Sequence, residues 1–466
     1  MDIDAPLRNS VLAVEEDTIF PIPADRRRGN TRGLCLVWLG ANQNILAILT
    51  GMIYCQVCHL SLFWAALAIL AGNGVGGMFM ALHAAQGPHL GIPQMQQTRG
   101  QFGAYGALLV IVVVIVMYVG FTATLLAIGR EQVQQALGGP PHQLPVYVLA
   151  AAILSLCIVG HGWIERFVVG FTYVAATAFF ALAAFFLFYL HALPVQPLMA
   201  LPSMHDFVAA VSIGVLWQVA YAPYVSDYSR YLPADTPERD AFWSCMTGSI
   251  IGTAVPTFLG AYMGSTAWAG NFYAAIHAHY TLPTYVLLGI VLISITVSCT
   301  MQIYCAALSC MTLFYTMWPT WRPTARSRGL LAGGLLLLSV LLTIMLSGDI
   351  LHILNSFIEF LLAVLSPWTA INLVDYYLIR HGDYDIWSFF RHDGGIYGRF
   401  NRPAIFCYIM GIVVQVPFIS NELYSGLMAR QMDGVDLSWV VGILLPGLVY
   451  WLICRQADSP ARPAVR

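Results

Sequence analysis

Long apolar stretches separated by short polar segments run along almost the whole chain. A helix needs about 20 apolar residues to cross the hydrocarbon layer of a membrane. Stretches of this kind lie near residues 33–54, 60–86, 103–129, 145–163, 166–190, 206–225, 243–268, 281–315, 329–347, 351–378, 402–420 and 437–454. Lipid offers no partner for open backbone groups, so the pattern predicts an all-α polytopic membrane protein with twelve transmembrane helices.

The same pattern divides the chain into five parts. They are a polar N-terminal segment (1–32), a core of ten spans (33–378), a loop (379–401), two peripheral spans (402–454) and a tail (455–466). All 21 basic residues are Arg, and only Arg130 and Arg430 fall in segments opposite the N-terminal side. Basic residues concentrate on the cytoplasmic side of membrane proteins. We therefore expect a multi-pass protein of the cell (inner) membrane with both termini cytoplasmic.

Composition narrows the class of protein. The 466 residues are 59% hydrophobic and only 9% charged, whereas soluble domains carry about 25% charged residues. The net charge is −2 and no basic stripe exists, which excludes a nucleic-acid partner. No filter-like repeat, Walker sequence or cluster of intramembrane ionisable residues is present, so channels, ATP-driven pumps and membrane enzymes are disfavoured. A secondary transporter remains.

Two short motifs resemble cofactor-binding sequences but lack the neighbouring features that such sites need. The glycine-rich residues 72–77 lie within a span and lack the Lys of a phosphate-binding loop, so they predict close helix packing through small residues. Residues 55–59 match the haem-attachment pattern but join two apolar spans with no soluble domain to enclose a haem. We expect no cofactor and no metal site beyond a co-transported H⁺ or Na⁺.

Helix-breaking and polar residues gather in the first and sixth spans. Asn42, Gln43 and Asn44 follow Gly40 near the middle of the first span, and Pro223 interrupts the sixth. Interrupted helices at matching positions of two repeats indicate a substrate site at the membrane midplane. The alternative is that the amides hold helices together and that the proline is a simple kink.

Three ionisable residues stand out. Glu359 is the one carboxylate well inside a span, where a charge is costly and by default functional. It predicts proton coupling, with a hydrogen-bonded neutral carboxyl or a salt bridge to an Arg as alternatives. Asp227 and Arg230, three residues apart at the end of the sixth span, are expected to hold an inner gate or a loop rather than touch substrate.

The order of several motifs carries a family resemblance. The motifs are residues 21–23 with 26–29, Trp38 with 50–51, residues 87–95 with 98–99 and 102–103, residues 226–233, Pro367 with 375–377, Arg380, Tyr384 and Tyr397, and residues 401–404. In this order they resemble the nucleobase–cation symporter family, the purine/cytosine permeases, and in particular the fungal-type purine–cytosine permease branch. The resemblance covers about residues 20 to 420.

The resemblance implies a fold and a substrate site. The fold is the leucine-transporter (LeuT) architecture, in which two inverted five-helix repeats with broken first and sixth helices are followed by two peripheral helices. A flat heterocycle then lies between aromatic rings of helices three and six while amides read its edge, which suits the energetics of stacking and of buried hydrogen bonds. The substrate-binding residues expected here are Tyr118 and Thr122 on helix three, Trp217, Gln218 and Tyr221 on helix six, Asn42 and Gln43 on helix one, and Gln302 on helix eight. Trp217 and Tyr221 remain alternatives for the stacking ring on helix six.

Helix eight departs most from the family pattern. Thr296 and Ser298 could join carbonyls near Ala41 and Asn44 as a sodium site. Small hydroxyls in membrane helices also commonly bond their own helix carbonyls, which is the alternative. Glu359 and this departure together predict proton coupling rather than sodium coupling.

We therefore expect an importer of a nucleobase or related N-heterocycle, driven by a proton or sodium gradient through alternating access. Its expected partners are the heterocyclic substrate, the coupling cation and the lipid bilayer. Importers of a hydantoin, allantoin or pyridine vitamer, or a transporter-like sensor that binds ligand without moving it, are the alternatives. The sequence leaves the oligomeric state and the identity of the base open.

Overall fold

The computed structural model describes residues 15–16, 18–138, 142–189, 191, 193–267, 281–345, 350–420 and 424–457. Within these ranges the chain is helical, and the sole β-type pairing is one isolated bridge between Ser420 and Ser425. The α-helices are α1 (Thr31–Asn42), α2 (Ile45–Gln56), α3 (Leu62–Leu90), α4 (Gln94–Phe102), α5 (Leu108–Leu137), α6 (Leu144–Val159), α7 (His161–Ala184), α8 (Met204–Val219), α9 (Val225–Ser229), α10 (Glu238–Gly264), α12 (Thr281–Met317), α13 (Ala325–Met345), α14 (Ile350–Leu373), α15 (Arg402–Gln415), α16 (Leu427–Gln431) and α17 (Ser438–Ala457). The all-α prediction is confirmed.

The long helices follow the apolar stretches. In the described part of the chain, nine helices are long and apolar enough to cross a membrane, and the bent pair α1–α2 makes a tenth span. The shorter apolar segments Leu144–Val159 and Arg402–Phe418 stand where two further spans are expected. The total of twelve therefore stays a prediction. One boundary differs clearly: the stretch expected from residue 103 begins at Leu108, after the separate short helix α4.

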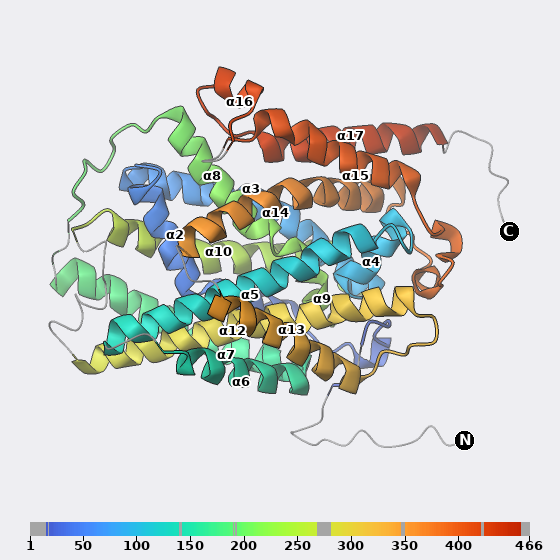
Figure 1. The fold of residues 1–466 in the computed structure, drawn as a ribbon, viewed down its shortest axis with the longest axis horizontal. Helices are drawn as coiled ribbons and strands as arrows, with labels where there is room; N and C mark the ends of the chain where they lie inside the picture. The colour runs from blue at the N-terminus through green and yellow to red at the C-terminus, as the bar shows by residue number, and fades with distance from the viewer. Residues whose placement is uncertain are drawn as a thin grey trace.

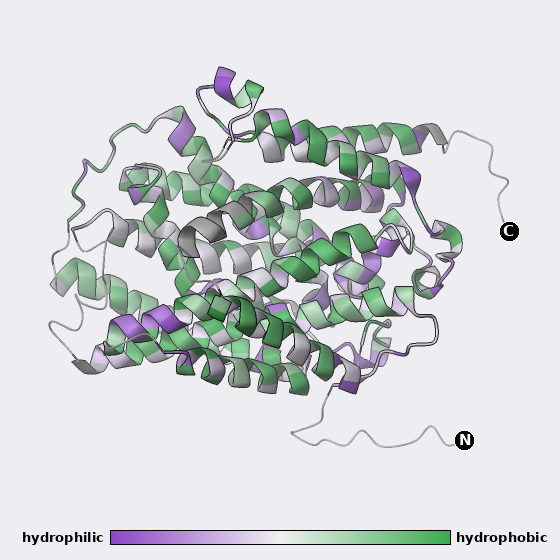
Figure 2. Cartoon of the chain, viewed as in Figure 1, coloured by the Kyte–Doolittle hydropathy of each residue, from purple (hydrophilic) through white to green (hydrophobic). Residues whose placement is uncertain are grey.

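The helices pack in three groups. A first group contains α1, α2, α3, α8, α9 and α10, and a second contains α5, α6, α7, α12 and α13, with contacts mostly within each group. The third group, α14, α15 and α17, lies along one edge of the molecule, opposite α6, α7 and α13 (Figure 1). Hydrophobic residues cover the helices, while hydrophilic ones gather near the helix ends and around α4 (Figure 2).

Small residues bring α3 and α8 close together, as predicted for residues 72–77. A Cβ added at Gly72 would lie 2.4 Å from the carbonyl oxygen of Val211, and one at Gly76 would lie 2.4 Å from that of Val215. Any larger side chain would force the two helices apart. The glycines therefore serve packing within the first group.

The first span is broken at Gln43 and Asn44, three and four residues after Gly40. Helix α1 ends at Asn42 and α2 begins at Ile45, with a 60° bend between them. Asn44 stabilises the break, because its side chain accepts a hydrogen bond from the Ala47 N–H and donates one to the Ala41 carbonyl. The expected interruption of the first span is thus present.

The sixth span is interrupted more gently. Helix α8 ends at Val219, and Ala222–Tyr224 form a 3₁₀ turn before α9 begins at Val225. Pro223 lies in this turn and has no N–H to continue an α-helix. The stretch Met204–Ser229 still runs as one span, so its interruption lacks the sharp bend of the first span.

Candidate functional site

A cavity lies between the first and second groups, next to both interrupted spans. It encloses about 990 Å³ of empty space, a figure that includes space open to the outside. Its lining comes from α2, α5, the α8 region and α12: Asn44, Leu46, Leu49, Thr50, Ile53, Met117, Tyr118, Phe121, Leu125, Ile213, Leu216, Trp217, Ala220, Tyr221, Tyr224, Ser298 and Gln302. The walls are mostly apolar, with aromatic rings on both sides.

Three of the aromatic residues expected at the site line the cavity. Tyr118 of α5 contributes to one wall, and Trp217 and Tyr221 come from the other side. The Trp217 indole N–H donates a 2.7 Å hydrogen bond to Asn42 Oδ1, which fixes the ring's orientation. Tyr221 packs edge-on against Trp38, with ring centroids 5.4 Å apart. Both candidate rings of the sixth span thus reach the cavity, and which one stacks on a substrate stays open.

Few polar side chains face the cavity. Gln302 of α12 reaches it, and its Oε1 has no hydrogen-bond partner among the described residues. Asn44 also lines the cavity, but its amide nitrogen and oxygen are already hydrogen-bonded to backbone groups on either side of the break between α1 and α2. An unpaired buried amide oxygen is costly unless a ligand or water completes it. Among the amides that line the cavity, Gln302 is therefore the one best placed to bond the edge of a bound ring.

Two other expected amides turn away from the cavity. Asn42 bonds Ser249 and Thr253 of α10, and Gln218 bonds these residues and Asn73 of α3. Neither Asn42 nor Gln218 lines the cavity, and both are fully buried. They connect the interrupted spans to α3 and α10. This agrees with the alternative expectation that amides within the spans hold helices together. A direct contact with substrate stays a prediction for both.

Gln43 and Thr122 are buried near the site without lining it. Gln43 lies in the break between α1 and α2, and its Oε1 has no partner among the described residues. Thr122 Oγ1, on α5, is likewise without one. Their roles as substrate contacts also stay predictions.

Two of the residues expected at a cation site, Ser298 and Ala41, lie in contact, and the site itself stays a prediction. The Ser298 hydroxyl lies 3.4 Å from the Ala41 carbonyl oxygen, so α12 meets the break in the first span at this point. Thr296 instead donates to the Leu292 carbonyl of its own helix, in agreement with the alternative for small hydroxyls. Glu359 belongs to α14, but its side chain lies outside the described part of the structure.

The cavity is closed on the side that faces the N-terminal segment. Tyr224 packs edge-on against Tyr118 and Tyr221, with ring centroids 5.3 and 5.5 Å away. Trp38 contacts Tyr224 and, one turn further from the cavity, Tyr228. Sequence reasoning missed Tyr224. The helical spacing of residues 217, 221, 224 and 228, all aromatic, could have revealed it.

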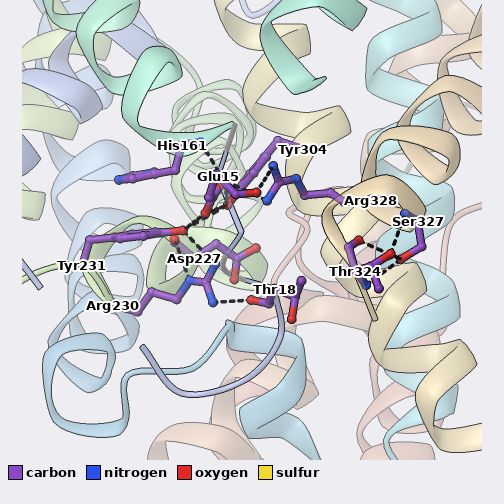
Figure 3. A network of polar contacts seen from close by, with 10 residues as sticks. All are labelled: Glu15, Thr18, His161, Asp227, Arg230, Tyr231, Tyr304, Thr324, Ser327 and Arg328. Atoms are coloured by element: carbon purple, nitrogen blue, oxygen red, sulfur yellow. Dashed lines mark hydrogen bonds and ion pairs between the residues drawn. The ribbon is translucent and has the colours of Figure 1, made fainter. Parts of the chain in front are cut away.

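The rings of Trp38, Tyr118, Tyr221, Tyr224 and Tyr228 form an aromatic layer at this side of the cavity. Asp227 and Arg230 bond neighbouring segments of the chain beyond this aromatic layer. The Asp227 carboxylate accepts a 2.8 Å hydrogen bond from the backbone N–H of Gln94, the first residue of α4. Arg230 donates to the Thr18 carbonyl in the N-terminal segment at 2.7 Å (Figure 3). Neither lines the cavity, in keeping with their expected structural or gating place.

Membrane-spanning helices around a central aromatic cavity that is closed toward one end of the bundle are the architecture of a membrane transporter. Residues 21–442 match the family model described as "Permease for cytosine/purines, uracil, thiamine, allantoin". The chain belongs to this family, that of the nucleobase–cation symporters, and is a secondary active transporter rather than an enzyme.

Individual relatives agree along nearly the full length. The chain is 34% identical to YxlA of Bacillus subtilis (strain 168), provisionally named a purine-cytosine permease, over 95% of this chain and 96% of that protein. It is 22% identical to the purine-cytosine permease fcyB of Emericella nidulans, over 94% of this chain and 88% of that protein. Among solved structures, Mhp1, a nucleobase-cation-symport-1 family transporter in a closed conformation with bromovinylhydantoin bound, superposes with a TM-score of 0.77. That alignment covers 96% of this chain and 97% of Mhp1 at 17% identity, and it confirms the expected LeuT-like fold.

Proposed function

We propose that this protein imports a nucleobase or a related flat N-heterocycle across the cell membrane, by alternating access coupled to a cation gradient. The observation that carries the proposal is the cavity, which places aromatic rings of α5 and of the interrupted sixth span around a mostly apolar space. The relatives' names support a purine or cytosine as the substrate class. Twelve spans with both termini cytoplasmic are part of the proposal.

A planar ring suits this cavity for two physical reasons. Stacking on an aromatic face contributes on the order of 1–3 kcal/mol per base, and any heterocycle has such a face. Discrimination then depends on the few polar side chains at the ring's edge, because a hydrogen-bonding group buried without a partner loses affinity. Gln302 is the leading candidate for this reading, since Asn44 already bonds the backbone.

The proposal is tested by binding and by uptake. Purified protein should be warmed with a panel of purines, cytosine, uracil, allantoin, hydantoins and pyridine vitamers, and the compound that raises the melting temperature most should then be supplied to proteoliposomes. Saturable uptake of a purine or cytosine is the expected result. Preferred uptake of a hydantoin, allantoin or vitamer would move the substrate class, and binding without any uptake would favour the sensor alternative.

For the coupling ion we propose the proton, with Glu359 as the carrier. The substitution Glu359→Gln fixes this side chain in a neutral form. The variant should still bind substrate and exchange it across proteoliposomes, but it should lose accumulation driven by a pH gradient. Thr296→Ala should leave coupling unchanged, because its hydroxyl bonds its own helix.

The contact between Ser298 and the Ala41 carbonyl favours sodium as the second candidate. Uptake that follows an imposed sodium gradient, ignores a protonophore and is lost in Ser298→Ala would establish sodium coupling. Glu359 would then be a structural hydrogen-bonding residue.

A further inference from the structure

A carboxylate from the N-terminal segment is inserted among the helix ends on the closed side of the bundle (Figure 3). Glu15 pairs with Arg328 of α13 at 3.0 Å and accepts a 2.9 Å hydrogen bond from the Tyr304 hydroxyl of α12. It also accepts one from the Tyr231 hydroxyl and one from the His161 backbone N–H, at the start of α7. Its side chain is only 10% exposed. One carboxylate thus joins four separate parts of the fold.

The charges around Glu15 keep it ionised. Burial by itself raises the pKa of the carboxyl, but the nearby charges of Arg328 and Arg230 and the hydrogen bond from Tyr231 lower it, and the net direction is below the ordinary value. Arg328 and Arg230 are themselves buried. A buried ion pair is costly to break by removing one partner, because the other charge is left uncompensated.

Backbone contacts seat the segment as well. The Glu15 N–H donates to the Val159 carbonyl, at the end of α6, at 3.0 Å, and Arg328 donates to the Glu15 carbonyl at 3.0 Å. Three residues further on, Thr18 accepts from Arg230. The segment is therefore held at both its backbone and its carboxylate.

The partners of Glu15 come from both helix groups that border the cavity. Tyr231 follows α9 of the first group, whereas Tyr304, His161 and Arg328 belong to the second group. The contacts also connect to the closed side of the cavity: His161 stacks on Tyr231 with centroids 3.7 Å apart and contacts Tyr228 of the aromatic layer. Glu15 thus ties the two groups together directly beyond that layer.

We propose that Glu15 is a latch that holds the closed end of the transporter shut and must leave its site for that end to open. This inference rests on the proposed alternating access. If the two groups part at this end to release substrate, one short carboxylate cannot keep both Tyr231 and the Tyr304–Arg328 pair. Glu15 is a positioning residue, since it does not line the cavity.

Native cysteines provide a test that needs no substrate. Cys305 is fully buried on α12 beside Tyr304, whereas Cys55 and Cys58 are buried in the separate apolar cluster that contains the end of α2. Membranes containing the full chain should be treated with N-ethylmaleimide, and modification of each cysteine should be followed by peptide mass spectrometry. Opening of the latched end is expected to expose Cys305 but neither Cys55 nor Cys58.

Glu15→Gln should raise the modification rate of Cys305 roughly tenfold or more, because a charge-assisted contact is replaced by a neutral one. Tyr304→Phe, which removes one donor to the carboxylate, should raise it less, and Glu15→Asp should restore part of the protection. The matched control is Glu16→Gln, at the neighbouring exposed acid, which should behave like the unaltered protein.

Two outcomes would overturn the latch. One is an unchanged Cys305 rate in Glu15→Gln, and the other is an equal rise at Cys55 and Cys58, which would show general loss of the fold. The readout is independent of transport. If no heterocycle is taken up but Cys305 becomes reactive while Cys55 and Cys58 stay protected, the latch stands and the proposed function fails.

Discussion

The regions on the two sides of Tyr224 are built from opposite chemistry. On one side lies a cavity lined by leucines, isoleucines and aromatic rings, with Gln302 as its one uncommitted amide among the described residues. On the other side, the buried Arg230 and Arg328 form, with the mostly covered Glu15, a tight network of charges and tyrosine hydroxyls. The two regions share the same helices but differ in what holds them.

This difference fits the separate tasks of a transporter. Apolar and aromatic walls accept a planar ring without forming specific bonds to one another, so the cavity can stay open. A buried ion pair is costly to separate partially, because each charge is then left without a partner. Such a contact suits an end of the transporter that is either fully closed or fully open. Substitutions on the two sides of Tyr224 should therefore have different consequences.

The largest effect should come from the charged side. Arg328→Gln leaves the Glu15 carboxylate buried without its ion pair, which should lower the free energy of unfolding by about 3–5 kcal/mol. Arg326→Gln, two residues earlier on the same helix and exposed, is the control. Denaturant titration in detergent measures both, and equal stability of the two variants would contradict the paired-charge account.

On the cavity side, removal of one aromatic wall should abolish saturable uptake while the protein remains folded. Trp217→Ala or Tyr118→Ala should weaken substrate binding about tenfold or more, since stacking contributes on the order of 1–3 kcal/mol. Tyr173→Ala, at an exposed ring of α7, is the control. Unchanged apparent affinity in both cavity variants would show that the ring binds elsewhere.

The amides should separate by what they touch. Gln302→Ala should change which heterocycles compete for uptake, because a lost buried hydrogen bond costs about 1–3 kcal/mol. Asn42→Ala should instead weaken all substrates alike, since Asn42 orients Trp217 and bonds α10. The competition profile of Gln43→Ala should be measured alongside these two variants. Identical competition profiles in all three variants would assign the amides to helix packing alone.

The break in the first span should depend on its cap. Asn44→Ala should cost about 1 kcal/mol of stability, the usual value of a helix N-cap. Asn30→Ala removes the corresponding cap of α1, outside the cavity. Both should lower the melting temperature, but only Asn44→Ala should also weaken substrate binding, and equal binding in the two variants would exclude the break from the site.

The smallest effect is expected from pH. The pKa of Glu15 is lower in the folded protein than in the unfolded chain. The stability that Glu15 contributes is therefore fully present above the ordinary carboxyl pKa, and it is lost as the pH falls from there through the lowered pKa of the folded state. The melting-temperature difference between the unaltered protein and Glu15→Gln should therefore stay constant from about pH 8 to about pH 6. A His161→Phe background removes the one histidine that faces the carboxylate among the described residues. A difference that shrinks across this range in that background would mean that Glu15 itself titrates there.

Much of the site could be predicted because its signals are local. Asn44 and Pro223 interrupt apolar stretches, and both mark real interruptions. Tyr118, Trp217 and Tyr221 follow from the family resemblance, whereas Gln302 is the one amide of helix eight, where the sequence departs from the family pattern. All four line the cavity. Asn42 and Gln218 could not be assigned in this way, because an amide within a span can face a cavity or a neighbouring helix equally well.

The membrane class, the approximate spans, the two interruptions and the family could all be inferred from the sequence alone, because hydropathy, helix-breaking residues and ordered motifs are local features of the chain. Which polar atoms already have hydrogen-bond partners is known only from the packed fold. It turned Asn42 and Gln218 toward α10, and it brought Ser298 rather than Thr296 to the Ala41 carbonyl. It also placed Glu15 against Tyr304, 289 residues away in sequence. A hydrogen bond or ion pair depends on direction and distance, and for residues far apart in the chain only the packing of the helices fixes these.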